Sequence, residues 1–493
     1  MIRQHLPALQ VILPLLAAPA CLLLRRAGLA WLFATVVGFA TFAIAILLLR
    51  QVLSQGDITY ALGGWSAPWG IQYYVDPVSA LVLLIVSGIS AVVLPYAARS
   101  VAREIPSERR CVFYTLFLLC LAGMLGIAIT GDAFNLFVFL EISSLSSYAL
   151  ISMGQDRRAL TSSYQYLIMG TIGATFILIG VGLLYVMTGT LNMQDLAQRL
   201  PAVATTRTIH TAFAFLVVGL SLKLALFPLH LWLPNAYTFA PSVVTTFLAA
   251  TATKVAFYAL LRFVFTIFGA EYAFNTMPLG PTLMLLALLG LFVASAVAIF
   301  QENIKRILAY SSVAQIGYMI LGISFATVTG VSAGILHLFN HALMKGALFM
   351  AVGAIFLRTG SMQLQHLAGI GRRMPWTMAA VVIGGLSLIG VPLTVGFISK
   401  WYLIQAALER GWWPVAVLVL IGSLLALVYV WRILEAAYFD APAKPDAHIK
   451  EAPLSLLIPT WALVLANIYF GIDTSLTVGV ARQAASLLLG VQP

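Results

Sequence analysis

"SLKLALFPLHLWLPNAY", residues 221–237, places Lys223 inside an apolar run and then interrupts that run with Pro228, His230 and Pro234. Within a helix, proline removes a backbone hydrogen bond and clashes with the preceding turn. An ammonium group is costly in apolar surroundings, and a buried lysine changes its protonation state readily. The stretch therefore predicts a broken helix in an apolar medium, with a titratable group beside the break.

The composition defines the class of the chain. Of its 493 residues, 61% are apolar and 9% are charged, and the mean hydropathy is +1.00. These values are typical of an integral membrane protein that crosses the bilayer many times. The net charge of +11 comes without a basic tract of interleaved aromatic residues, which excludes nucleic acid as a partner. Three cysteines without disulfide or metal spacing are interpreted as packing residues: Cys21, Cys111 and Cys120.

Apolar stretches of roughly 20 residues, the length that crosses a bilayer, recur along the chain. They lie near 7–24, 29–50, 78–98, 111–130, 133–153, 163–187, 212–234, 242–268, 280–300, 307–327, 330–357, 377–408, 413–432 and 453–473. Because a bilayer admits only segments that satisfy their own backbone hydrogen bonds, each stretch is predicted to be helical. We expect an all-α polytopic membrane protein of about 14 transmembrane helices. No loop is long enough to build a soluble domain.

Basic side chains in loops or near helix ends indicate the orientation. With the N-terminus outside, 16 of them fall on the cytoplasmic side and 7 on the opposite side. The cytoplasmic set is Arg25, Arg26, Arg99, Arg103, Arg109, Arg110, Arg157, Arg158, Lys305, Arg306, Arg358, Arg372, Arg373, Arg432, Lys444 and Lys450; the opposite set is Arg3, Arg50, Arg199, Arg207, Arg262, Arg410 and Arg482. By the positive-inside rule we expect a bacterial inner membrane protein with both termini on the periplasmic side.

Four lysines lie inside apolar stretches, whereas the arginines lie in loops or near helix ends. The four are Lys223, Lys254, Lys345 and Lys400. Together with Glu141 they cost very roughly 12 to 17 kcal/mol if unpaired, at about 2.5 to 3.5 kcal/mol each. Arginine cannot be deprotonated in a protein, but a buried lysine can exchange a proton, so this pattern favours a proton relay. A structural role also fits any single lysine, which can snorkel or donate to the free carbonyls of a broken helix.

Glu141, in "GDAFNLFVFLEISSLSSYAL" (131–150), is the only carboxylate in a mid-membrane position. Its expected counter-ion is one of the buried lysines, and a proton would separate the two charges. The alternative is a static ion pair. Asp132 precedes the same helix and is expected either at a channel mouth or as the helix N-cap.

"HLFNHALMK" (337–345) spaces His337, His341 and Lys345 at i, i+4 and i+8, so all three face one side of a helix. Imidazole accepts and donates at its two nitrogens, which suits a hydrogen-bonded proton wire. The competing interpretation is a zinc site. No glutamate follows the first histidine and no third ligand is apparent, which disfavours zinc.

A second broken helix matches the first. "LKLALFPLHLWLP" (222–234) is echoed by "GVPLTVGFISKWYL" (390–403), in which Pro392 and Gly396 precede Lys400. Paired interrupted segments in two halves of a membrane protein point to inverted repeats around an ion path. The expected division is an N-terminal three-helix segment (1–110), two five-helix repeats (111–268 and 280–432), and a C-terminal loop, helix and tail (433–493).

These residues lie in stretches that resemble the antiporter-like proton-channel family shared by respiratory complex I and the Mrp multisubunit sodium/proton antiporters. The similar stretches are "FNLFVFLEISSLSSYAL", "LKLALFPLHLWLPNAY", "TATKVAFYALLR", "NIKRILAYSSVAQIGYMILG", "HLFNHALMKGALF" and "GFISKWYL". Within that family, the opening "LPALQVILPLLAAPACLLL" and residues 63–84 are most similar to the D-type subunits of the Mrp antiporters. The resemblance implies fourteen helices with two inverted five-helix repeats that contain broken helices.

The resemblance also implies a function. In the family the Glu-Lys pair, here Glu141 and Lys223, gates a half-channel, and Lys254 with the histidine helix bridges to a second site, here Lys400, from which the proton leaves. We expect a transporter subunit that moves protons in a multisubunit antiporter for Na+ or K+, without a cofactor of its own. The expected partners are other membrane subunits, including a larger homologous one, and the lipid bilayer.

Two other functions stay open at this point. The same polar axis could serve a proton-pumping subunit of an NADH or ferredoxin:quinone oxidoreductase, with the electron transfer in partner subunits, because the chain has no glycine fingerprint and no cysteine cluster. An intramembrane enzyme with zinc at His337 and His341 is the other alternative.

Overall fold

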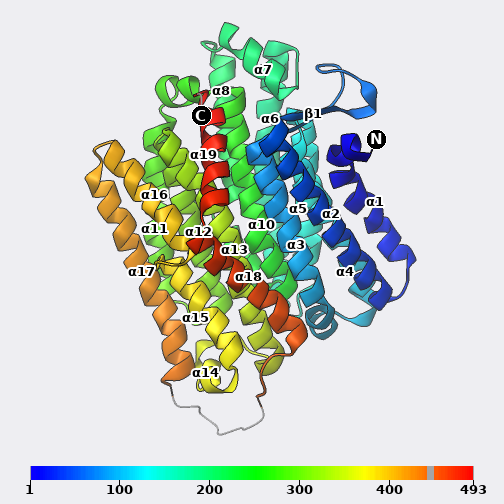
Figure 1. Cartoon of the computed structure of the whole chain (residues 1–493), viewed down its shortest axis with the longest axis vertical. Coiled ribbons are helices and arrows are strands. Elements are labelled where there is room, and N and C mark those ends of the chain that lie inside the picture. Colours follow the sequence, from blue (N-terminus) through cyan, green and yellow to red (C-terminus); the bar gives the residue numbers. More distant parts are fainter. Residues whose placement is uncertain (1, 441–448, 492–493) are drawn as a thin grey trace.

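The computed structural model describes residues 2–440 and 449–491, and its long helices run side by side along one axis (Figure 1). In the described part, 13 helices are long and apolar enough to cross a membrane. They are α1 (Leu6–Leu23), α2 (Ala27–Gln55), α3 (Pro77–Glu104), α4 (Arg110–Ile129), α5 (Ala133–Ser152), α6 (Arg158–Thr188), α8 (Arg207–Leu224), α10 (Ser242–Leu261), α11 (Leu279–Ile299), α12 (Ile304–Ser324), α13 (Val328–Thr359), α17 (Trp413–Tyr438) and α18 (Leu454–Ile472).

Shorter elements connect or complete these spans. The short α-helices are α7 (Met193–Arg199), α9 (Trp232–Phe239), α14 (Ile370–Arg373), α15 (Pro375–Ile389), α16 (Val395–Glu409) and α19 (Ser475–Leu489). The 3-10 turns are η1 (Ile2–His5), η2 (Leu62–Gly64), η3 (Ser107–Arg109), η4 (Leu200–Ala202) and η7 (Leu364–Leu367), and the π-helical turns are η5 (Arg262–Ile267) and η6 (Tyr272–Thr276). The two strands are β1 (Ile58–Ala61) and β2 (Gln72–Val75).

The prediction of an all-α membrane protein with about 14 spans is confirmed. α15 and α16 have 15 residues each, too few for either to span a bilayer alone. Together they supply one more crossing, over the predicted stretch 377–408, in addition to the 13 long helices of the described ranges. The division into two inverted repeats stays a prediction.

Burial separates central helices from peripheral ones. The membrane-crossing windows of α10 and α12 are 94% buried inside the molecule, whereas those of α2, α6, α11 and α17 are only 39% buried. The peripheral helices expose leucine, isoleucine, valine and phenylalanine side chains, which a bilayer accepts as readily as a protein core. α10 and α12 therefore form the centre together with α13, which packs against both and whose membrane-crossing window is 78% buried, and the polar side chains on these helices are withdrawn from lipid.

The first predicted break lies between α8 and α9. α8 ends at Leu224, and Ala225 adopts a left-handed conformation with φ 61°. The chain turns through Pro228 and resumes as a helix at Trp232. The Trp232 indole N–H donates at 3.0 Å to the carbonyl of Leu222, in the last turn of α8, and so ties the start of α9 to the end of α8.

The second break lies between α15 and α16. Gly390, with φ 92°, ends α15, and Pro392 lies in the turn before α16 begins at Val395. A side chain on Gly390 would be strained at this φ, and its Cβ would lie 2.9 Å from Cδ of Lys400. Glycine is therefore required for the turn and for the close approach of Lys400.

A third interruption, between α18 and α19, was not predicted. α18 runs obliquely toward the middle of the molecule, and α19 continues from there toward the end that carries both termini (Figure 1). A Cβ on Gly471, at the end of α18, would lie 2.5 Å from the backbone of Thr394, so this interruption packs on the one between α15 and α16. The sequence after the last predicted span (453–473) was expected to be a tail. It is a helix, α19, that packs on α3 and α13.

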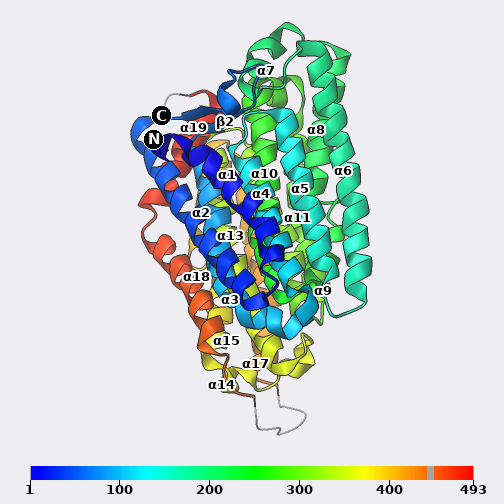
Figure 2. The same ribbon diagram turned by 90° about the vertical axis from the view of Figure 1, so that its right-hand side faces the viewer.

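The end of the molecule that carries both termini also carries the two strands (Figure 2). β1 and β2 pair antiparallel, with Ile58 opposite Val75. Tyr73 bridges to Thr130, so this hairpin is attached to the connection between α4 and α5. The location of both termini at one end fits the even number of predicted spans; which side of the membrane they face stays a prediction. Lys444, assigned above to the cytoplasmic side, lies outside the described residues.

Candidate functional site

Glu141 and Lys223 form an ion pair between α5 and α8. Nζ of Lys223 donates to Oε1 of Glu141 at 3.0 Å and to Oγ of Ser144 at 2.8 Å. The lysine side chain is 4% exposed and the glutamate side chain is 27% exposed. The prediction that a buried lysine is the counter-ion of Glu141 is confirmed. The pair is asymmetric, because its cation is enclosed while its carboxylate reaches the side of the bundle.

A small cavity adjoins Lys223. Its volume is about 20 Å³, and serine side chains of α5, Tyr166 of α6, and Val255 and Ala256 of α10 line it. A cavity of roughly 10 to 15 Å³ is enough for one water molecule if polar partners are present. Ser143, Ser144 and Lys223 supply such partners. The cavity therefore has room for one water molecule between Lys223 and α10.

Lys254 lies on α10 and is fully buried. Its Nζ donates to the carbonyl of Ala249 and, at 3.4 Å, to the hydroxyl of Thr253. Within the described ranges no carboxylate pairs with Lys254, so its charge, when present, is offset by neutral dipoles only. The lysine interacts electrostatically with the two histidines and with Lys345 of α13. It thus occupies the centre of the predicted row.

The three titratable groups of α13 are fully buried on one side of the helix, as the i, i+4, i+8 spacing predicts. Nδ1 of His337 is 2.8 Å from Oγ of Ser399, and the rings of His337 and His341 are 6.1 Å apart between centroids. Lys345 donates to the carbonyl of Leu308 at 2.8 Å and to the hydroxyl of Ser311 on α12.

Several imidazole nitrogens in this row have no protein partner. Both ring nitrogens of His341 and Nε2 of His337 are buried without a hydrogen bond from another described group. Buried polar atoms of this kind are usually satisfied by ordered water. These nitrogens therefore leave positions at which water could bond between Lys254 and Ser399, and their part in proton transfer stays a prediction.

Lys400 lies on α16, beside the second break. Its Nζ donates to the carbonyls of Leu388 and Ile389 at 2.8 and 2.9 Å and to Oγ of Ser423 at 3.0 Å. It also lies 4.7 Å from the ring centroid of Tyr318. The two carbonyls are acceptors that the end of α15 leaves free. Lys400 thus fastens a broken helix, the structural alternative considered for these lysines, and its neighbour Ser399 contacts His337.

The four auxiliary residues differ in position. Pro228 and His230 lie in the turn between α8 and α9, where the His230 ring stacks on Phe227 with centroids 5.3 Å apart and its Nδ1 is buried without a partner. Pro392 lies in the turn between α15 and α16. Asp132 accepts from the backbone N–H of Asn135 at 2.7 Å, so the N-cap role is confirmed. Burial raises the pKa of the Asp132 carboxyl, against the opposing effect of this hydrogen bond.

Two buried charge clusters were missed by the sequence analysis. Arg262, assigned above to the outer side, is 3% exposed and its Nη2 lies 2.5 Å from Oδ1 of Asp76, at the start of α3. Its Nε donates to the hydroxyl of Tyr258 at 2.8 Å. Lys254, Tyr258 and Arg262 recur every four residues, and this spacing was a signal for one helix face. The partner Asp76 is distant in sequence and gave no signal.

The other cluster lies at the junction of α9 and α10. Lys305, interpreted above as a positive-inside anchor, is 4% exposed and donates to the carbonyl of Ala240 at 2.9 Å. Glu104 accepts from the backbone N–H of Ser242 at 2.9 Å and so caps α10. The two side chains fix the connection that follows the first break. Their contacts required knowledge of the tertiary fold.

A metal site is not formed by this arrangement. Across residues 2–440 and 449–491, no group of three His, Cys, Asp or Glu side chains is placed to hold a metal ion. Lys254, Lys345 and Lys400, rather than carboxylates or thiols, are the charged groups that interact with the two histidines. The fold and this row define a polytopic membrane protein with an internal series of buried titratable side chains.

Comparison with known proteins identifies the family. Residues 130–426 match the family model described as "NADH:quinone oxidoreductase/Mrp antiporter, TM", and the chain belongs to this family. It is 41% identical to the N subunit of the NADH-quinone oxidoreductase of Desulforudis audaxviator over 95% of this chain and 96% of that protein. It is 30% identical to the D subunit of the Na(+)/H(+) antiporter of Bacillus subtilis over 98% of this chain and 96% of that protein.

Solved structures show the same architecture. A chain of an archaeal respiratory membrane complex, the membrane-bound sulfane sulfur reductase, superposes with a TM-score of 0.90 at 33% identity, with 98% of each chain covered. A chain of the Mrp complex from Dietzia sp. DQ12-45-1b superposes with a TM-score of 0.90 at 26% identity, covering 99% of this chain and 98% of that one. The expected resemblance to the D-type subunits of Mrp antiporters and to complex I subunits is confirmed.

Proposed function

We propose that this chain is the proton-translocating membrane subunit of a multisubunit monovalent cation/proton antiporter. The observation that carries the proposal is the row of buried titratable groups that starts at the Glu141–Lys223 pair and ends at Lys400. Both ends of the row lie beside helix breaks, and its members avoid the lipid-facing helices. Such a row is costly to bury, and a proton path gives it a use.

The first step is a proton exchange at the ion pair. A proton that reaches Glu141 neutralises the carboxylate and removes the charge that holds the Lys223 ammonium in place. Lys223 then releases its own proton to water in the adjacent cavity, next to α10. The proton passes to Lys254, and transfer of the proton from Glu141 to the neutral Lys223 then restores the ion pair.

The later steps use α13 and α16. Lys254 passes the proton to His341, and water joins His341 to His337 because their facing nitrogens have no protein partner. Ser399 accepts or donates at Nδ1 of His337 and adjoins Lys400, from which the proton leaves. Lys345 lies on the same side of α13, and its charge adjusts the proton affinity of His341.

The surroundings of the path are part of the proposal. The chain lies in a bacterial inner membrane with both termini on the periplasmic side, as the distribution of basic residues indicates. Its partners are other membrane subunits, including a larger homologous one, and a neighbouring subunit couples the proton flux to the exchange of Na+ or K+. The direction of net flux follows the gradients across the membrane.

A second function is favoured by one observation. The identity to the N subunit of an NADH-quinone oxidoreductase is 41%, against 30% to the D subunit of an antiporter, over a similar share of the chain. In a redox-driven pump the same row would move protons, and the flavin and iron-sulfur chemistry would belong to partner subunits. The two functions differ in what surrounds the chain, not in the proposed path.

The experiment separates the path from its driving force. The complex is purified through an affinity tag on this chain, its subunits are identified by mass spectrometry, and proton flux is followed in vesicles with a pH-sensitive dye. Small hydrophobic subunits with cation-dependent flux support the antiporter; flavin and iron-sulfur subunits support the redox pump. In either complex, Lys254→Met abolishes flux and the exposed Lys450→Met control does not. Full flux in Lys254→Met overturns the proposed path.

A further inference from the structure

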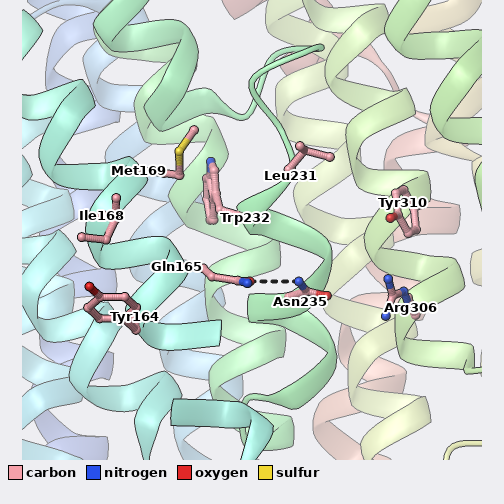
Figure 3. A pocket seen from close by; sticks show the side chains of 9 residues that line it. All are labelled: Tyr164, Gln165, Ile168, Met169, Leu231, Trp232, Asn235, Arg306 and Tyr310. Atoms are coloured by element: carbon pink, nitrogen blue, oxygen red, sulfur yellow. Dashed lines mark hydrogen bonds between the residues drawn. The ribbon is translucent and has the colours of Figure 1, made fainter. Parts of the chain in front are cut away.

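A pocket of about 490 Å³ lies on the side of the molecule, and residues of α6, α9 and α12 line it (Figure 3). The residues that line it are Tyr164, Gln165, Ile168, Met169, Leu231, Trp232, Asn235, Arg306 and Tyr310. Within this lining, Asn235 of α9 donates to Gln165 of α6 at 3.0 Å (Figure 3). The proposed proton path does not use this pocket, and its volume is in the range of small-molecule binding sites, about 300 to 1,000 Å³.

Arg306 is the charged group of the pocket, and among residues 2–440 and 449–491 no hydrogen-bond acceptor of its guanidinium is found. Its Nε is buried without a hydrogen bond, and no carboxylate of the described residues pairs with it. The guanidinium lies 5.9 Å from the ring centroid of Tyr310. By contrast, Arg158 and Arg262 pair with carboxylates. A partly buried cation without acceptors is costly, and an anionic ligand would supply them.

The pocket lies near the end of the bundle opposite both termini. Arg306 is in the first turn of α12, and the connection before α12 is tied to the segment that precedes α14 by a hydrogen bond from Leu364 N–H to the carbonyl of Glu302, at 2.8 Å. α14 marks this end in Figure 1. Tyr164 lies in the second turn of α6, which starts at the same end. Arginine and tyrosine at this depth are typical of the layer of lipid headgroups.

An apolar strip leads from the pocket toward the middle of the membrane. Tyr164, Ile168, Ile172 and Ile179 follow one another on α6 at spacings close to whole helical turns, and each is exposed. Leu231, on the opposite wall of the pocket, is 69% exposed. A ligand with an anionic head at Arg306 and apolar chains along α6 matches this arrangement of one charge and one strip.

We propose that this pocket binds the headgroup of an anionic phospholipid, with its phosphate on Arg306 and its acyl chains along the exposed strip of α6. Basic pockets between membrane helices on the cytoplasmic side bind such headgroups through charge and hydrogen bonds. The pocket is larger than a single carboxylate side chain fills, and the strip continues below headgroup depth. These features favour a lipid over an acidic side chain of a neighbouring subunit.

The pocket is attached to the first helix break. Leu231 and Trp232, the residues where the chain resumes as α9, form part of its wall. The Trp232 ring stacks on Tyr166 with centroids 3.9 Å apart, and Tyr166 lines the cavity beside Lys223. A bound headgroup would therefore stiffen the segment that contacts the lining of the cavity beside Lys223.

The test measures lipid binding to the intact complex. The complex is delipidated in a neutral detergent and titrated with phosphatidylglycerol or phosphatidylcholine, and native mass spectrometry counts the lipids retained. Three variants are compared with the wild type. Arg306→Gln removes the charge, Ile168→Trp fills the pocket while the charge remains, and Arg157→Gln removes an exposed arginine that is expected on the same side of the membrane and does not line the pocket.

The proposal predicts selective loss of one tightly held phosphatidylglycerol. In Arg306→Gln the concentration for half-retention rises about fivefold, the factor that corresponds to one arginine beside an anionic lipid. Ile168→Trp loses the same lipid, whereas Arg157→Gln and the binding of phosphatidylcholine are unchanged. Retention of this lipid by both pocket variants overturns the proposal. Dissociation of a neighbouring subunit from Arg306→Gln without any change in lipid binding also overturns it and assigns Arg306 to a protein contact.

Discussion

The two helix breaks beside the proposed path each carry a lysine, but the lysines have different partners. Lys223 is paired with a carboxylate at 3.0 Å, whereas Lys400 donates to two backbone carbonyls and a serine. The charge of Lys223 is therefore stabilised by a neighbour that can itself be protonated. The charge of Lys400 is stabilised by carbonyl and hydroxyl dipoles, which do not take up a proton. Similar sequence patterns thus give Lys223 a counter-ion that can be neutralised by a proton and give Lys400 neutral hydrogen-bond acceptors.

The largest effect is expected from removal of the counter-ion pair. Lys223→Ala and Glu141→Ala should each reduce proton flux to the level of empty vesicles. The reason is that the proposed entry step needs both groups: Glu141 takes up a proton, and Lys223 then releases one. Loss of one partner of a buried pair costs about 3 to 5 kcal/mol, so assembly is checked in parallel by size-exclusion chromatography. Flux in either assembled variant at the wild-type level would contradict the proposed entry site.

Arginine substitutions sharpen the comparison of the two lysines. Arginine keeps the charge and the donors but cannot release its proton. Lys223→Arg should assemble and fail to transport, and Lys400→Arg should also fail if Lys400 passes the proton on. Proton flux in vesicles is measured for both variants at equal complex content. Normal flux in Lys400→Arg alone would mean that Lys400 only fastens the end of α15.

The glycine of the second break should affect stability. Gly390→Ala places a Cβ 2.9 Å from Cδ of Lys400 at φ 92°. We expect a loss of about 1 to 3 kcal/mol from this strain and reduced flux, measured by thermal unfolding in detergent and by the vesicle assay. Gly182→Ala is the control, because a Cβ there meets nothing within 4 Å and alanine favours the helix. Equal stability of the two variants would show that the turn tolerates a side chain.

The smallest effect concerns the first break. Ala225 has φ 61°, where a side chain is strained by about 1 to 2 kcal/mol. Ala225→Gly should relieve this strain, but glycine also gains freedom in the unfolded chain, so the net gain in stability is expected to be less than about 1 kcal/mol. Thermal unfolding would detect it as a small rise in melting temperature. A clear fall would indicate that the Ala225 methyl group contributes packing that outweighs its strain.

The sequence was sufficient for features that depend on neighbouring residues along the chain. Apolar length predicted the spans, proline with glycine or histidine predicted both breaks, and the four-residue spacing aligned His337, His341 and Lys345. The pairing of Glu141 with a buried lysine also followed, because a lone carboxylate in a membrane needs a cation. In each case one strong constraint of the bilayer left few alternatives.

Features that depend on tertiary contacts were not predictable. Asp76 and Arg262 are 186 residues apart in the sequence. From its local sequence alone, Asp76 is expected only to cap a helix. Lys305 lies at a helix end, where a basic residue is expected on the surface, and only its contact with Ala240 reveals its burial. α19 has 15 residues and contains Arg482, so its length and polarity fall below the signal of a span. Its placement depends on the turn at which α18 ends.

The hydrogen bonds of Lys400 couple its protonation state to the orientation of a neighbouring hydroxyl group. An ammonium group has three N–H bonds, and all three are used by the carbonyls of Leu388 and Ile389 and by Ser423. A neutral amine has only two N–H bonds and gains a lone pair. Departure of the proton therefore obliges the Ser423 hydroxyl, now directed at the carbonyl of Val419 at 3.3 Å, to rotate and donate to the nitrogen. The orientation of the Ser423 hydroxyl, on α17, then depends on whether Lys400 is protonated.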